Sequence, residues 1–392
     1  MAFAIIVLVA ALFLKIDKFK IFLFFLFPFT CGIPGYTMLV SIIALFFKSI
    51  SKIKLRKLQV IPILFIAFLE FFNCIIHTGD VDTSAYLSFM SFTAVFFFLL
   101  FDKDNYKQSR ECILAFIFGT VFVAFIIYYK MIEVYGLDMI LMGKLRGAMG
   151  DVYEEGAGKL ITNGNNMAYL SIVLIGILML GAKRLRLPAI LYNSLLVLSI
   201  LIGMGSFSRT WMLLFALIIV AYLLHERNLK ALFSLVIIFG AVILLFPNIL
   251  AGFTNVMTDR MAGDNIETGG GRTVIFNQYN EVWSQSILYV LFGTSLTSYH
   301  EVTNISGSMH NSIQQIYVTL GLIGLLLYIG LFIKFFNTKN VGKPSLFNYL
   351  PFFAGAMFLQ SIQFLEPYFL MLPLIPACYA FLVRDFDSNK NT

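Results

Sequence analysis

The feature that most constrains the fold is a series of apolar runs, each about 17 to 20 residues long, the length an α-helix needs to cross a membrane. Charged residues make up only 12% of the 392 residues, whereas soluble domains contain about 25%. A soluble fold has too little interior to bury this much apolar surface. Because a chain in lipid must satisfy its own backbone hydrogen bonds, such runs indicate helices rather than barrel strands. The sequence therefore predicts an all-α, polytopic integral membrane protein.

The spans follow one another along the whole chain. Ten are placed at 59–77, 85–101, 111–130, 165–182, 188–204, 209–224, 231–247, 309–335, 346–363 and 367–383. Residues 1–47 fit two or three further crossings, because Lys15, Lys18 and Lys20 interrupt one apolar stretch and the string CGIPG (31–35) breaks the next. We favour two, which gives about 12 transmembrane helices in a single membrane domain over residues 1–392.

Positive charge orients these spans. Most lysines and arginines fall in alternate short loops, for example 48–57, 103–110 and 183–186, and the positive-inside rule places such loops in the cytoplasm. The net charge of +7 is explained by these loops, so nucleic acid is excluded as a partner. The long segments 131–164 and 248–308 then lie on the outer face, where long loops usually carry function.

The second long segment contains an amphipathic pattern. Apolar residues recur at helical spacing with polar residues between them: Ile275, Tyr279, Val282, Trp283 and Ile287. This pattern predicts a helix that lies on the membrane surface.

Arg209 stands at the predicted outer mouth of a helix. It follows Ser206 and Ser208, whose hydroxyls can cap the first free N–H groups of the helix. A cation at this end opposes the helix dipole, which indicates an anionic substrate. The alternative is an arginine that reaches toward lipid phosphates.

Arg272 belongs to the string GGGRT (269–273), which precedes the predicted surface helix. Free backbone N–H groups at a glycine-rich helix start can hold a phosphate together with the guanidinium group. A plain flexible turn is the alternative.

His310 stands where the long outer segment enters the next span, followed by Asn311. A neutral imidazole at such a partly dry position can take a proton from a sugar hydroxyl. The alternative is a histidine that only forms a hydrogen bond at the end of a loop.

Acidic residues give two further candidates. Asp80 and Asp82 form an outer D-x-D pair, a metal-binding pattern in glycosyltransferases, but a solvated turn is the favoured interpretation in so short a loop.

Glu70 lies deep in a span, where a carboxylate needs a partner. It is predicted to pair with an outer arginine or to face a polar cavity, in support of the substrate site. No His, Asp and Glu residues have metal-ligand spacing, so neither a metal nor another cofactor is predicted.

Taken together, four strings resemble the O-antigen polymerase and O-antigen ligase family of bacterial cell-surface polysaccharide synthesis. The likeness covers roughly residues 140–335, and the four strings are LRGAMG (145–150) with TNGNNMAYL (162–170), SFSRT around Arg209, GGGRT to Trp283 followed by LFGTS (291–295), and HNSIQQ with GLIG (321–324). The second half of the first string looks like the N-P-N-x-x-A entry to a helix in that family. Gly164 replaces the expected proline, and an acidic insertion, DVYEE, separates the two halves.

The resemblance implies a metal-independent glycosyltransferase whose donor is a glycan carried on undecaprenyl pyrophosphate. The catalytic residues would be His310, Arg209 and Arg272, and the substrate-binding residues would be Arg146, Asn165 and Asn311, with Glu70 added from the interpretation above. The location implied is the bacterial cytoplasmic (inner) membrane, with the active site facing the periplasm or cell exterior. Membrane lipids, a flippase and a chain-length regulator are candidate partners.

Several functions remain open at this stage. The first is a polymerase of O-antigen or capsule repeat units, and the second is a ligase that transfers the glycan to the lipid A core of lipopolysaccharide. A transporter or flippase would instead concentrate charged residues and broken helices near the bilayer midplane, whereas polar residues here lie in outer loops. A metal-dependent glycosyltransferase with monophosphate-linked donors would depend on Asp80 and Asp82.

Overall fold

The computed structural model describes residues 2–26, 57–79, 109–138, 164–206, 208–226, 272–305 and 311–336, with isolated positions between these ranges. Within them the chain forms helices and turns and no strand, so the predicted all-α fold is confirmed for this part. The chain divides into two compact units, one of residues 1–116, 271–342 and 361–392, the other of residues 117–270 and 343–360.

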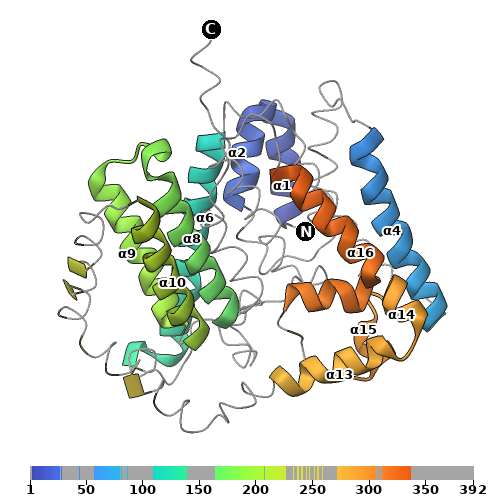
Figure 1. Cartoon of the computed structure of the whole chain (residues 1–392). Helices are drawn as coiled ribbons and strands as arrows, with labels where there is room; N and C mark the ends of the chain where they lie inside the picture. Colours follow the sequence, from blue (N-terminus) through green and yellow to red (C-terminus); the bar gives the residue numbers. More distant parts are fainter. Residues whose placement is uncertain are drawn as a thin grey trace. The chain divides into compact units, whose positions relative to one another are not determined.

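Most of the described helices coincide with predicted spans (Figure 1). They are α4 (Lys57–Thr78), α6 (Ser109–Tyr135), α8 (Gly164–Leu185), α9 (Ala189–Gly205), α10 (Arg209–Glu226) and α16 (Ser312–Phe336). Two separate short helices, α1 (Ala2–Phe13) and α2 (Ile16–Leu26), precede them. The spans predicted at 346–363 and 367–383 lie outside the described residues, as do nearly all of 85–101 and most of 231–247.

One stretch among the described residues, Arg110–Glu133 of α6, is long and apolar enough to cross a membrane by length and composition. Shorter apolar stretches lie in α4, α8, α9, α10 and α16. The helical nature of these segments is therefore confirmed, and the number of membrane crossings stays a prediction.

The first unit is built around contacts between α4, α16 and three helices that lie within the long segment 248–308: α13 (Arg272–Ser284), α14 (Ile287–Phe292) and α15 (Tyr299–Thr303). A buried cluster of Tyr279, Tyr299, Met309 and Val318 forms its centre. Ile275 and Trp283 pack against this cluster, so the apolar stripe of the predicted surface helix contacts protein. The helix predicted over this segment is present as α13, but Ile287 of the predicted stripe begins the separate helix α14 and is 69% exposed.

α16 is broken at Gly321, which has φ 67° and ψ −174°, and Figure 1 shows the bend between its two limbs. A break leaves carbonyl groups at the end of the first limb (residues 312–320) without helical partners. The loop after α14 supplies those partners, because the N–H groups of Thr294 and Ser295 donate to the carbonyls of Val318 at 2.9 Å and Thr319 at 3.0 Å. Gly293, at φ 87°, makes this close backbone crossing possible.

Candidate functional site

α13 and the first limb of α16 run side by side in the same direction. The side-chain Nε2 of Gln314 donates to the backbone carbonyl of Phe276 at 2.8 Å. One turn further along both helices, the hydroxyl of Tyr317 donates to Oδ1 of Asn280, and the rings of Tyr317 and Trp283 meet edge to face with centroids 5.1 Å apart. Because these contacts advance together, the N-terminal ends of both helices lie at the same end of the pair.

Two of the predicted site residues begin these helices. α13 starts at Arg272. Asn311 precedes α16, and its Oδ1 accepts hydrogen bonds from the N–H groups of Ile313 at 3.0 Å and Gln314 at 3.1 Å. Asn311 therefore caps the helix, in addition to the substrate-binding role predicted for it. The side chain of Arg272 and the whole of His310 lie outside the described residues.

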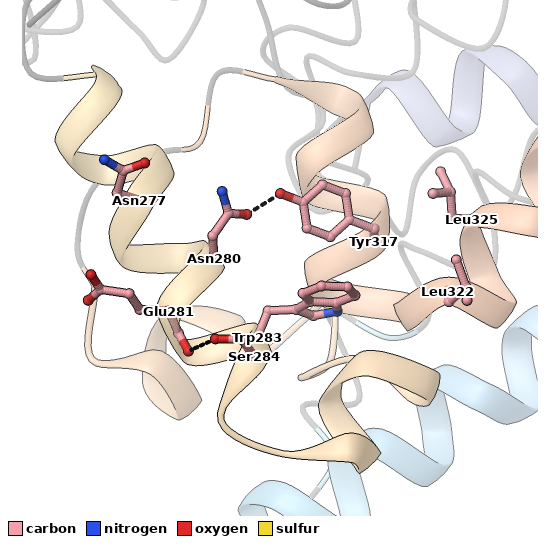
Figure 2. A pocket seen from close by; sticks show the side chains of 8 residues that line it. All are labelled: Asn277, Asn280, Glu281, Trp283, Ser284, Tyr317, Leu322 and Leu325. Atoms are coloured by element: carbon pink, nitrogen blue, oxygen red, sulfur yellow. Dashed lines mark hydrogen bonds between the residues drawn. The ribbon is translucent and has the colours of Figure 1, made fainter.

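A pocket of about 580 Å³ opens between the two helices, within the usual range of about 300 to 1,000 Å³ for small-molecule sites. Figure 2 shows its two sides. Asn277, Glu281 and Ser284 form an outer polar row on α13, while Asn280 and Trp283 form an inner row that reaches toward Tyr317. Leu322 and Leu325, from α16 beyond its break, complete the lining.

Tyr279 anchors the opposite face of α13. Its side chain is fully buried, and its hydroxyl donates to the backbone carbonyl of Ile305 at 3.2 Å. Burial raises the pKa of Tyr279 to about 12, with a hydrogen bond from Thr303 acting in the other direction. The phenol therefore stays a neutral hydrogen-bond donor across physiological pH. Its hydrogen bond holds α13 against the backbone at Ile305.

Glu70 binds the loop after α14, whose N–H groups pair with the carbonyls freed at the break in α16. Its side chain is 0% exposed, and both carboxylate oxygens accept from the N–H of Leu296, at 3.0 and 2.8 Å. Oε1 also accepts from the N–H and the hydroxyl of Thr297, each at 2.8 Å, and from the hydroxyl of Ser295 at 2.9 Å. One turn further along α4, Asn73 donates to the carbonyl of Phe292 at 2.7 Å.

The described partners of Glu70 are neutral groups. The sequence suggested an outer arginine or a polar cavity, and within the part of the chain that the structure describes the carboxylate accepts from N–H and O–H donors. Several charge-assisted hydrogen bonds, each worth about 1.5 to 3 kcal/mol, can replace an ion pair for a buried carboxylate. Glu70 is therefore a support for the α14–α16 crossing rather than a group open to a ligand.

Replacing Glu70 with glutamine should destabilise the protein by about 1 to 3 kcal/mol, because an amide NH₂ would then face the N–H of Leu296 or Thr297. Thermal unfolding of the purified protein measures this effect. The matched control is Glu301→Gln, an exposed position on α15, where the change should stay within about 0.5 kcal/mol. Equal unfolding temperatures for the two variants would show that the carboxylate is dispensable.

Arg209 is the first residue of α10 in the second unit. The hydroxyl of Ser208 accepts from the N–H of Trp211 at 3.4 Å, as the sequence predicted. Ser206 behaves differently, since its hydroxyl donates to the carbonyl of Gly203 at 2.6 Å, at the end of α9. The Trp211 indole donates to Ser171 of α8 at 2.9 Å, which ties the start of α10 to the rest of its unit.

Other predicted residues are only partly described. Asn165 lies in the first turn of α8, but its side chain and that of Arg209 lie outside the described residues. The whole of Arg146, Asp80 and Asp82 also lies outside them. Among the residues that the structure does describe, no group of three or more His, Cys, Asp or Glu side chains is placed to hold a metal ion.

Asn280 and Tyr317 were not predicted from the sequence as site residues. Both occur at ordinary positions within helices. Only the parallel pairing of two separate helices brings them together, and the local sequence does not indicate that pairing. Trp283 was noted for its periodicity and as the end of one string of the family resemblance, but it was not predicted as a site residue. Comparisons of the chain with models of protein families, with curated proteins and with solved structures found no match.

Proposed function

We propose that the protein is a polytopic membrane polysaccharide polymerase that resembles the O-antigen polymerases. It transfers a glycan from undecaprenyl pyrophosphate onto the next lipid-linked repeat unit at the outer face of the cytoplasmic membrane. The observation that carries this proposal is the parallel pairing of α13 and α16. The N-terminal ends of the two helices, at Arg272 and Asn311, lie at the same end of the pair, and the side chains that line the pocket, among them Asn280, Trp283 and Tyr317, follow further along the helices.

The proposed chemistry needs one base and a cationic grip on the leaving group. The hydroxyl oxygen of the acceptor sugar attacks the anomeric carbon of the donor glycan while His310 takes the hydroxyl proton. The bond from the anomeric carbon to the pyrophosphate oxygen breaks, and undecaprenyl pyrophosphate leaves. Arg272 stabilises the charge that develops on it, because a guanidinium group offers forked donors suited to phosphate oxygens.

The distribution of side chains on α4 supports the membrane part of the proposal. Glu70 and Asn73 are buried, whereas Phe68 is 64% exposed, Leu64 59% and Phe72 41%. A helix that hides its polar residues and exposes its largest apolar ones is suited to a lipid environment. The apolar helices of both units fit the same interpretation.

A transporter would share one feature with this protein, the broken helix. In a transporter the freed backbone groups coordinate the cargo. Here the carbonyls at the end of the first limb of α16 accept from Thr294, Ser295 and Asn73, so they are already engaged. The break is thus better explained as the place where the loop after α14 binds α16. This favours the enzyme over the transporter.

The direct test is to incubate the purified full chain with lipid-linked oligosaccharide and to separate the products by length. A polymerase should give a ladder of regularly spaced lengths, and the ladder should persist after divalent ions are chelated. Adding lipid A core to a parallel reaction identifies a ligase, because the glycan would then appear on that acceptor without a ladder. Failure to consume the donor in both reactions would refute glycosyl transfer.

A further inference from the structure

We propose that the pocket between α13 and α16 is a saccharide subsite that holds one uncharged sugar ring of the glycan. This inference rests on the proposed function and makes it more specific, since it separates the place of a sugar from the place of the pyrophosphate. It also assigns binding roles to Asn280, Trp283 and Tyr317, which lie on two different helices.

The charges of the residues that line the pocket favour the neutral sugar part of the substrate over its pyrophosphate. A pyrophosphate needs cationic donors, and the described residues that line the pocket include no lysine, arginine or histidine. They do include Glu281, whose carboxylate would repel a phosphate or an acidic sugar. A neutral sugar is compatible with this lining, because its hydroxyl groups can both donate and accept.

The shape and chemistry of the lining fit a sugar ring. Trp283 and Tyr317, in edge-to-face contact, offer apolar ring surface to the C–H groups of a sugar. The Oδ1 of Asn280 is occupied by the Tyr317 hydroxyl, which leaves its NH₂ group to donate to a sugar hydroxyl. The indole N–H of Trp283 is itself buried and has no hydrogen-bond partner among the described residues, so the contribution of Trp283 to a ligand is its ring surface. Figure 2 shows these three side chains turned toward one another.

A lipid chain is the main competing ligand, because Leu322 and Leu325 lie on one side of the pocket. An isoprenoid chain would satisfy those two leucines but would cover the NH₂ group of Asn280 without giving it a hydrogen-bond partner, which is unfavourable for a polar group removed from water. A sugar satisfies both sides, since its polar edge meets the amides and its C–H face meets the apolar residues.

The test is a binding titration that needs no turnover. The probe is the oligosaccharide released by mild acid from the lipid-linked pool of the source cells, added to the purified full chain. The readout is tryptophan fluorescence, because the chain has only two tryptophans: Trp283 lines the pocket, and Trp211 is buried in the second unit. The wild-type protein should show a saturable change.

Asn280→Asp is the most informative variant. Aspartate keeps an acceptor for the Tyr317 hydroxyl but loses the NH₂ donor, so oligosaccharide binding should weaken by about tenfold or more. Asn277→Ala, at an exposed position that lines the pocket, should also weaken binding and protects the test if Asn280→Asp folds poorly. The matched control is Gln278→Ala, an exposed neighbour on the same turn of α13 that is not among the lining residues, where binding should be unchanged.

The outcomes separate this inference from the proposed function. Equal binding by wild type, Asn280→Asp and Asn277→Ala would overturn the subsite even if the ladder of products forms. A fluorescence change caused by undecaprenyl phosphate without sugar, with none caused by the oligosaccharide, would assign the pocket to lipid and also overturn it. Binding that depends on Asn280 in a protein that forms no ladder would support the subsite and refute the polymerase.

Discussion

Gly321→Ala should destabilise the first unit by roughly 2 to 6 kcal/mol, enough to prevent recovery of folded protein from most preparations. Gly321 has φ 67° and ψ −174°, a region of backbone conformation that costs other residues about 1 to 3 kcal/mol. An added Cβ would also meet the backbone of Leu291 and Phe292, which adds about 1 to 3 kcal/mol of overpacking. The measurement is thermal unfolding together with the yield of monodisperse protein.

Gly330→Ala is the matched control for this prediction. Gly330 lies in the same helix, and a Cβ there would meet nothing within 4 Å. Alanine is favoured over glycine inside a helix by roughly 0.5 to 1 kcal/mol, so this variant should be as stable as the wild type or slightly more stable. If both variants unfold at the same temperature, the backbone crossing at Gly321 is not under the constraint that we infer.

His310→Ala should lower the rate of chain extension by about 10² to 10⁴, the usual contribution of a general base. Single lipid-linked repeat units should accumulate and long chains should disappear, while the protein stays folded. The measurement is the ladder of products formed from lipid-linked oligosaccharide, followed over time for equal amounts of wild type and variant.

His225→Ala is the control for His310, because His225 lies near the end of α10, which the charge distribution of the sequence predicts to be cytoplasmic. This variant should extend chains at the wild-type rate. Long chains of normal length and amount from His310→Ala would show that the imidazole is not the base, and a different group would then have to accept the proton of the acceptor hydroxyl.

Much of the helical structure could be predicted from the sequence. The segments 165–182 and 188–204 were predicted as helices and correspond to α8 and α9, because an apolar run of this length is typical of a helix rather than a strand. The spacing of Ile275, Tyr279 and Trp283 predicted α13, because helical periodicity is a property of consecutive residues. The cap that Ser208 provides for α10 was predictable for the same reason.

The site itself depends on contacts between distant segments. Leu296 donates to Glu70 across 226 positions in the sequence, and Tyr317 donates to Asn280 across 37. Nothing in the local sequence around Glu70 indicates that backbone N–H groups will surround it, so an arginine was the natural prediction. Likewise, Gly293 and Gly321 acquire their importance only because two backbones cross there.

The amino-acid sequence by itself determined which segments are helical and which of their faces are apolar, because both properties follow from hydrogen bonds and side-chain spacing within a few residues. The tertiary structure alone decided that α13 and α16 run in parallel and that a pocket lies between them. The physical reason is that a helix can bury one apolar stripe in many orientations. The partner, direction and register are fixed by a few specific contacts, here those of Gln314 and Tyr317.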